Sequence, residues 1–190
     1  MAGERLKEKL GLKELQKEGG WFREIGKSKT EENDRPVTLR QCSQFQKGTV
    51  AAMNMGPSEV KDSSSILFML QGVDFSAWHR LSSDEYFCFH SGSNIRIHMI
   101  DGSGAYSSVL VGPVLDLDPE QEEEPVLQYL VPRDTWFASE LVNKDLESYC
   151  LVSCIVVPPF EWDKFELGEL GTLVQLFPEH QERIKPFCRN

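Results

Sequence analysis

Long apolar runs are missing from this sequence, and so is an excess of positive charge. No stretch is long enough to cross a bilayer, and the start, MAGERLKEKLGLKEL, lacks the apolar centre of a signal peptide. The chain has 20 Lys and Arg against 30 Asp and Glu, a formal net charge of −10. Nucleic acids and anionic membranes repel such a protein at long range. The composition therefore predicts neither a nucleic-acid partner nor a membrane partner.

Cysteine pairs are also missing. The number of cysteines is odd and no CxxC pair occurs among Cys42, Cys88, Cys150, Cys154 and Cys188. Zinc sites built from thiols need closely spaced ligand pairs, which this pattern does not offer. Disulfides seldom persist in the cytosol. We therefore expect reduced thiols and a cytoplasmic protein.

The length of 190 residues is most simply that of one domain. We expect three parts: residues 1–35 as an N-terminal helix and arm, 36–160 as a β-barrel, and 161–190 as a C-terminal segment. Leucines spaced among charges predict an amphipathic helix within 4–18, which Gly11 breaks or kinks and Gly19-Gly20 ends.

Between polar connections, the chain consists of short runs with strand character. The runs are 49–55, 64–70, 75–81, 85–90, 94–100, 105–112, 125–131, 135–141 and 149–157. Several alternate, as in NIRIHMI, where Ile95, Ile97 and Met99 share one face. Many short strands separated by Gly, Ser, Asp and Pro turns indicate a sandwich or barrel. The predicted fold class is all-β with a short N-terminal helix, and a second short helix is expected around 168–177.

Spacing within residues 72–92 resembles the first motif of the cupin superfamily. The order is Gly72, six residues, His79, five residues, Glu85, six residues, Gly92. The region of the second cupin motif is VPRDTWFASE, in which Asp134 stands where glycine is usual and Trp136-Phe137 replaces a third histidine.

The full set of motifs is more specific. KEGGWFREIGKS, SILFMLQGVDFSAWHRLSSDEYFCFHSG, VPRDTWFASEL and LVSCIVVPPFEWDKFEL occur in this order. They resemble the cupin family DUF985, also called cupin-5, from about Leu6 to Leu170. The resemblance implies a double-stranded β-helix, or jelly-roll barrel, that usually forms a homodimer. It also implies structural similarity to sugar-nucleotide epimerases and seed storage proteins, without one general activity.

Metal binding is one possible chemistry. Cupin metal sites commonly use three histidines and a carboxylate, and a facial site needs at least three ligands. His79 and Glu85 match two ligand positions, whereas Arg80-Leu81 and Trp136 occupy the places of the others. We expect no cofactor, with a divalent metal on His79 and Glu85 as the alternative.

Acid–base chemistry is the other possibility. A histidine in a barrel mouth titrates near neutrality and can transfer protons. A neighbouring carboxylate such as Glu85 can orient the ring and stabilise its charged form. The epimerase type of mechanism also needs a second acid, for which Tyr86, Tyr106, Tyr129 and Tyr149 are candidates. The competing interpretation of His79 is an ordinary core residue.

A pocket with apolar walls and a few convergent polar groups is the usual form of a ligand site. We expect Trp78, Arg80, Trp136, Arg23 and Phe87 to bind the ligand around catalytic His79 and Glu85, with arginine suited to an anionic group. The leading hypothesis is a cupin that binds a small sugar- or nucleotide-like ligand and isomerises it without metal. The alternatives are a metal-dependent cupin oxygenase and a non-enzymatic storage or binding protein.

Overall fold

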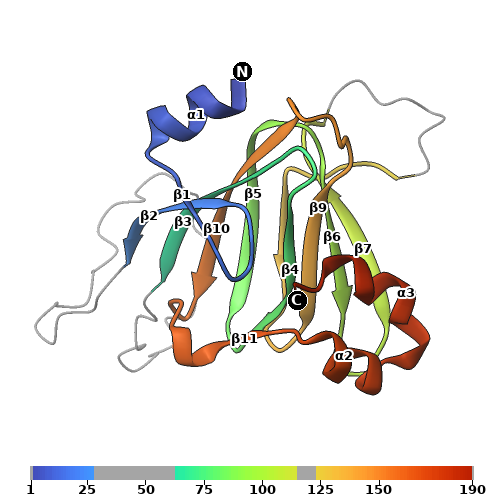
Figure 1. Cartoon of the computed structure of the whole chain (residues 1–190). Coiled ribbons are helices and arrows are strands. Elements are labelled where there is room, and N and C mark those ends of the chain that lie inside the picture. The colour runs from blue at the N-terminus through green and yellow to red at the C-terminus, as the bar shows by residue number, and fades with distance from the viewer. Residues whose placement is uncertain (1, 28–62, 115–122, 190) are drawn as a thin grey trace, which may run out of the picture.

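The computed structural model describes residues 2–27, 63–114 and 123–189 (Figure 1). Helix α1 spans Ala2–Leu10, and strands make up most of the rest. The strands are β1 (Lys13–Glu14), β2 (Trp21–Lys27), β3 (Ser64–Gln71), β4 (Phe75–Leu81), β5 (Asp84–Gly92), β6 (Ile95–Ile100), β7 (Tyr106–Val111), β8 (Gln128–Val131), β9 (Trp136–Leu141), β10 (Tyr149–Val157) and β11 (Phe165–Leu167). The C-terminal segment holds η1 (Trp162–Lys164), α2 (Leu170–Leu176), η2 (Pro178–His180), α3 (Gln181–Ile184) and η3 (Lys185–Phe187).

The strands form two antiparallel sheets that pack face to face. One sheet has six strands in the order β1-β2-β3-β10-β5-β8, and the other has five in the order β11-β4-β9-β6-β7. The two sheets lie on either side of a common core, and the C-terminal helices pack on the outside of the five-stranded sheet (Figure 1). The predicted all-β fold of the jelly-roll kind is confirmed.

Most of the predicted elements are present. The runs from 64 to 157 form strands, and α2 lies within the range expected for the second short helix. The run 49–55 lies outside the described residues. Three of the described strands were not predicted: β1 and β2 lie within the expected N-terminal arm, where β1 pairs with β2 and β2 pairs with β3, and β11 pairs with β4.

The N-terminal helix is shorter than its leucine pattern suggested. It ends at Leu10 because Gly11 adopts φ +64°, a left-handed conformation that stops the helix. Strand β1 follows, so residues 12–18 are not helical. The remaining amphipathic turns still bury apolar side chains: Leu6 and Leu10 pack on Leu12, Met69 and Leu151.

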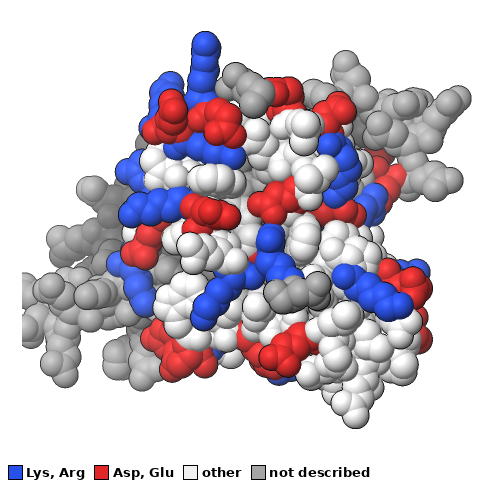
Figure 2. Space-filling model, viewed as in Figure 1, with Lys and Arg blue, Asp and Glu red and all other residues white. Residues whose placement is uncertain are grey.

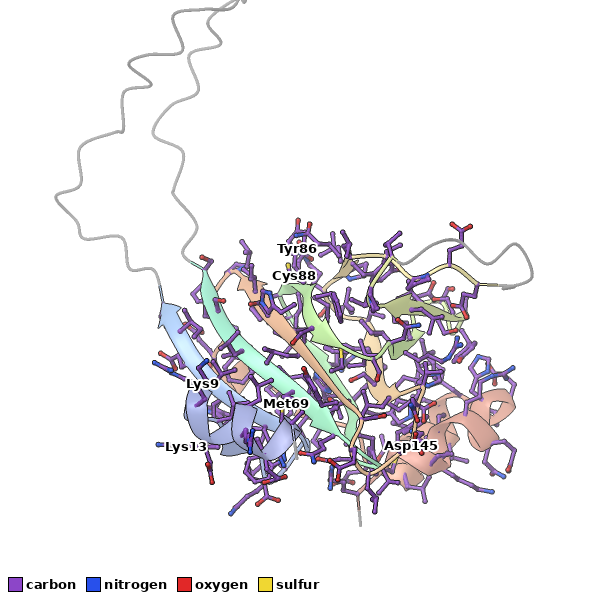
Figure 3. All side chains as sticks on the ribbon, turned by 90° about the horizontal axis from the view of Figure 1, so that it is seen from above. Lys9, Lys13, Met69, Tyr86, Cys88 and Asp145 are labelled. Atoms are coloured by element: carbon purple, nitrogen blue, oxygen red, sulfur yellow. The ribbon has the colours of Figure 1, made fainter. Side chains whose placement is uncertain are left out.

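Three apolar clusters stabilise the fold. The largest lies between the sheets and includes the inward residues Ile95, Ile97 and Met99 of β6. A second lies between the five-stranded sheet and the C-terminal helices, and a third lies under α1. Seen from above, Met69 lies beside α1, whereas Tyr86 and Cys88 lie on β5 away from it (Figure 3). Helix α1 therefore covers the part of the six-stranded sheet near Met69 and not the part near Tyr86 and Cys88.

The surface carries charges of both signs. On the face shown in Figure 2, acidic and basic side chains are interspersed. Among residues 2–27, 63–114 and 123–189, no helix is long and apolar enough to cross a membrane. Cys88, Cys150, Cys154 and Cys188 are free thiols, and Cys42 lies outside the described residues.

Candidate functional site

A cavity of about 570 Å³ opens between the two sheets. Strands β3, β4, β5 and β10 contribute alternate side chains to it, as the period of a pleated strand requires, whereas β2 contributes Phe22, Glu24 and, beyond a bulge, Lys27. The lining consists of Leu15, Glu18, Phe22, Glu24, Lys27, Ser64, Ile66, Phe68, His79, Leu81, Glu85, Phe87, Cys154, Val156, Phe160, Glu161, Trp162 and Phe165. Its volume suits a small organic molecule.

His79 projects into this cavity from β4 and is only 3% exposed. Its ring packs against Phe137 and Phe165, with centroid distances of 4.0 and 5.4 Å. Nδ1 lies 2.7 Å from the Ala77 carbonyl oxygen, which can only accept a hydrogen bond. Nδ1 therefore carries the proton in the neutral ring, and Nε2 keeps its lone pair.

Glu18 is the carboxylate beside this imidazole. Its Oε1 lies 3.8 Å from His79 Nε2 and accepts a 2.6 Å hydrogen bond from Ser76 Oγ. From the sequence we expected Glu85 to orient the ring of His79. In the described part of the chain, Glu18 is the carboxylate within ion-pair distance of the ring. A protonated His79 would thus have its counter-ion in place.

The turn that carries Glu18 is fixed by contacts with β4 and with Arg189 near the C-terminus. The Ala77 amide donates to the Glu18 carbonyl oxygen at 2.8 Å, and Arg189 Nε donates to the same oxygen at 3.0 Å. Gly19 adopts φ +105°, and a Cβ there would lie 2.2 Å from the Phe75 carbonyl oxygen. Only glycine permits this close approach, so the KEGGW motif holds Glu18 against the start of β4.

Glu85 supplies the buried carboxyl group of the cavity. It projects inward from β5 and is 7% exposed. Burial raises its pKa to about 8, and the negative charge of Glu18 contributes in the same direction, while a hydrogen bond with Cys154 opposes the shift. Glu85 is therefore largely protonated near neutral pH and can act as an acid.

An aromatic cluster lines another part of the cavity. Phe160, Trp162 and Phe165 pack edge to face, with centroid distances between 5.0 and 6.0 Å. Trp162 is 60% exposed, although it belongs to this cluster and tryptophan side chains are on average highly buried. These rings offer faces on which a ligand can stack.

Three of the residues singled out from the sequence meet in the cavity: His79, Glu85 and Phe87. The other expected ligand-binding residues do not line it. Trp78 and Trp136 pack under the C-terminal helices in the second apolar cluster. Arg80 stacks its guanidinium 4.7 Å from the Trp136 ring and pairs with Glu166 on the same outer face. Since His79 points inward, its neighbours Trp78 and Arg80 must point outward.

Arg23 is likewise placed elsewhere. On β2, Phe22 and Glu24 point into the cavity, so Arg23 between them points out. Its Nη1 donates to the Leu10 carbonyl oxygen at 2.9 Å, at the end of α1. The two arginines expected to bind an anionic group therefore have structural partners instead, and Lys27 is the basic residue among the lining.

The tyrosines expected as second acids also lie away from the cavity lining. Tyr86 is exposed on the outer face of β5, Tyr129 packs against the main core, and Tyr149 belongs to the cluster under α1. Tyr106 donates or accepts a hydrogen bond with His98 at 2.8 Å. Glu85 is thus better placed than any of the four tyrosines to act as an acid in the cavity.

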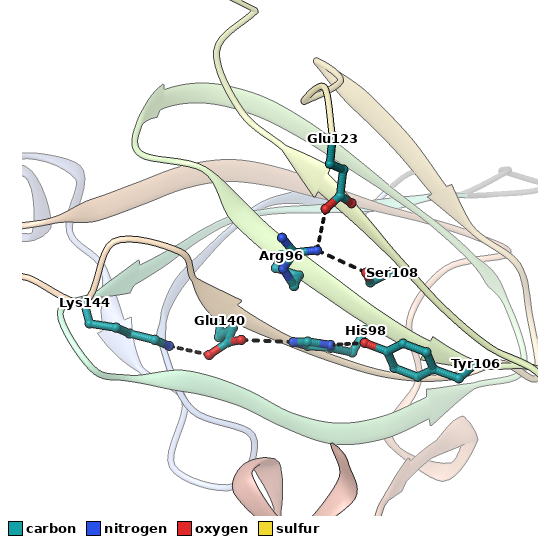
Figure 4. A network of polar contacts seen from close by, with 7 residues as sticks. All are labelled: Arg96, His98, Tyr106, Ser108, Glu123, Glu140 and Lys144. Atoms are coloured by element: carbon teal, nitrogen blue, oxygen red, sulfur yellow. Dashed lines mark hydrogen bonds and ion pairs between the residues drawn. The ribbon is translucent and has the colours of Figure 1, made fainter. Parts of the chain in front are cut away.

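A second polar network covers the outer face of the five-stranded sheet (Figure 4). Its members are Arg96, His98, Tyr106, Ser108, Glu123, Glu140 and Lys144. The ring of His98 stacks on Phe187 at 4.8 Å, so His98 is buried under the C-terminal segment rather than exposed. Burial lowers the pKa of His98, despite the opposing effect of Glu140. The stacking of His98 on Phe187 brings this network into contact with the C-terminal segment.

The side chains do not fit a cupin metal centre. Within residues 2–27, 63–114 and 123–189, no three His, Cys, Asp or Glu side chains form a group that could hold a metal ion. The position of the third cupin histidine is taken by Trp136, which is buried.

The turn of the second cupin motif is nevertheless retained. Asp134 adopts φ 62°, in the left-handed region that usually favours glycine, and its amide donates to the Leu81 carbonyl oxygen at 2.8 Å. Aspartate tolerates this conformation better than most residues. The backbone of the motif therefore persists although its metal-binding side chain does not.

Sequence reasoning missed several lining residues, above all Glu18. The signal was an acidic side chain directly before the glycine pair of KEGGW. The aromatic cluster was also missed, although PPFEWDKFEL was among the motifs that carried the family resemblance. Neither signal indicates which way a side chain points.

Comparison with known proteins identifies the family. The family described as Cupin superfamily (DUF985) matches residues 4–168. Protein SO0799 from Shewanella oneidensis has a similar structure, with a TM-score of 0.73, 28% identity, and coverage of 98% of this chain and 96% of that chain. A hypothetical protein from Leishmania major has a TM-score of 0.70 and 27% identity, and the match covers 98% of this chain and 98% of that chain. No protein with a curated description matches the sequence. The chain belongs to the DUF985 family of the cupin superfamily.

Proposed function

We propose that this cupin binds a small organic ligand in the cavity and moves a proton on it without a metal. His79 serves as the base and Glu85 as the acid. One observation carries the proposal: a single cavity contains an imidazole with a free Nε2 and a carboxyl group that keeps its proton near neutral pH. Groups with opposite protonation needs in one site are typical of acid–base catalysis.

The reaction class is isomerisation next to a carbonyl group. His79 Nε2 takes a proton from the carbon beside the carbonyl, so that the C–H bond breaks and an N–H bond forms. The electron pair moves to the carbonyl oxygen, which receives the proton of Glu85. His79 then returns a proton to a carbon of this enol intermediate, a carbonyl group re-forms from a hydroxyl, and the proton of that hydroxyl passes to Glu85, so that both groups are restored. Glu18 stabilises the imidazolium that exists between these two steps.

The lining also bears on the kind of ligand. Aromatic faces suit the apolar side of a sugar-like ring, and the carboxyl groups can accept hydrogen bonds from its hydroxyls. A phosphate-bearing nucleotide suits the lining less, because Glu18, Glu24 and Glu161 face the cavity with Lys27 as the basic residue. Of the two ligand kinds expected from the sequence, we therefore favour the sugar-like one.

Deuterium exchange tests the proposal directly. The protein is incubated in D2O with glucose, fructose or glucosamine. Proton NMR follows the signal of the hydrogen bound to the carbon beside the carbonyl group. We expect protein-dependent exchange on at least one sugar, lost in His79→Gln. His90→Gln is the matched control, because His90 is exposed and binds Ser153 rather than lining the cavity. Exchange on none of them, or exchange that survives His79→Gln, contradicts the acid–base role.

A further inference from the structure

We infer that the ligand of this cavity is a small organic cation, a class that includes amino sugars, with an ammonium group held among the carboxylates and aromatic rings. The inference rests on the ligand-binding part of the proposed function and not on proton transfer. It begins with the ionisable groups of the lining: four carboxyl groups, from Glu18, Glu24, Glu85 and Glu161, against the single ammonium of Lys27.

Two charged groups of the lining, Glu161 and Lys27, already have partners. Glu161 pairs with Lys164, with 2.6 Å between Oε2 and Nζ. Lys27 Nζ donates to the Phe160 carbonyl oxygen at 3.0 Å. The ion pair with Lys164 compensates the charge of Glu161, whereas Lys27 keeps its positive charge at the end of the cavity near Phe160.

Glu18 is different. Its side chain is 16% exposed, and its contacts are the Ser76 hydroxyl and the imidazole of His79. Among the described residues, no Lys or Arg pairs with it. Its negative charge is thus partly buried without a permanent counter-ion, a situation that an entering cation would relieve.

The aromatic cluster provides the second element of cation recognition. An ammonium group over a ring face is attracted by the quadrupole of the ring, and the attraction grows when water is excluded. Phe165 packs on His79 directly and Phe160 adjoins it, so ring faces and the Glu18 carboxylate border the same space. Apolar substituents of the ligand would lie against Phe22, Phe68 and Phe87.

Anionic ligands meet the opposite conditions. Arg23 and Arg80 point away from the cavity, and the whole chain carries a net charge of −10. An anion would therefore have to be desolvated beside like charges. A cation, in contrast, would meet the carboxylate of Glu18, which has no Lys or Arg partner among the described residues.

A charge series of one shape tests the inference. Choline, 3,3-dimethylbutan-1-ol and 3,3-dimethylbutanoate share a branched head and differ mainly in charge. Titration calorimetry should show choline binding about tenfold more tightly than the alcohol, with the carboxylate weaker still.

Two isosteric variants locate the effect. Glu18→Gln removes the charge but keeps the hydrogen-bonding shape, so it should weaken choline about tenfold and leave the alcohol unchanged. Glu166→Gln removes a carboxylate on the outer face and should change neither. Because Glu18→Gln still binds the alcohol, loss of folding is distinguished from loss of charge.

Each other outcome overturns the inference. Equal affinity for choline and the alcohol shows that the cavity binds ligands without regard to charge, and leaves the proposed function intact. Tighter binding of the carboxylate than of choline would show that the cavity prefers an anion. Choline binding unaffected by Glu18→Gln places the cation outside the cavity. If none of the three compounds binds, the inference of a cationic ligand is wrong. The deuterium-exchange experiment still tests the proposed function separately.

Discussion

Glu85 should make the protein less stable as the pH rises through neutrality. The folded protein holds the pKa of Glu85 at about 8, against 4.5 for an ordinary glutamate. Between these values the folded state binds more protons than the unfolded state, so the free energy of unfolding falls with increasing pH. Glu85 therefore lowers the free energy of unfolding least below pH 4.5 and most above pH 8.

The size of the effect follows from the shift. A pKa difference from 4.5 to about 8, at about 1.4 kcal/mol per unit, disfavours the ionised folded state by about 5 kcal/mol. Over the experimentally convenient window from about pH 5 to about pH 8.5, linkage gives a change of about 4 kcal/mol. Glu85→Gln removes the ionisable group while keeping its shape, so this part of the pH dependence should disappear.

Urea unfolding followed by tryptophan fluorescence measures the difference. Relative to the parent protein, Glu85→Gln should gain about 4 kcal/mol between about pH 5 and about pH 8.5. Glu166→Gln serves as the control, because its exposed ion pair with Arg80 is worth about 1 kcal/mol or less at either pH. Parallel stability curves for the parent and Glu85→Gln would refute the idea that burial keeps Glu85 protonated.

Three further predictions concern the surrounding structure. Trp78→Ala should cost about 3–5 kcal/mol in urea unfolding, because Trp78 is fully buried under the C-terminal helices, yet leave ligand affinity of the folded protein unchanged; a loss of affinity would put Trp78 in the site. Arg189→Ala should speed hydrogen exchange of the Ala77 amide, which binds the Glu18 carbonyl oxygen, by about tenfold or more while core amides of β10 stay protected; unchanged Ala77 exchange would mean that Arg189 does not hold the turn. We also expect a homodimer, and light scattering that gives the mass of one chain at micromolar concentration would contradict it.

Local patterns in the sequence were sufficient for the fold class. Alternation in NIRIHMI identified the inward face of β6, and turn residues separated most of the strands. The resemblance of the Gly72–Gly92 spacing to the first cupin motif indicated His79 and Glu85, two of the polar side chains that line the cavity. Alternation along β4 places Trp78 and Arg80 on the face opposite His79, which the prediction of ligand-binding residues did not take into account.

Tertiary structure alone decided what surrounds these two residues. Glu18 reaches His79 from a turn near the N-terminus that Arg189 fastens from the other end of the chain. Phe160 and Phe165 arrive from a third segment. No local periodicity encodes such long-range pairing, which depends on how whole sheets pack. The protonation of Glu85 follows from burial and from the charge of Glu18, and both are properties of the packed structure rather than of the residue.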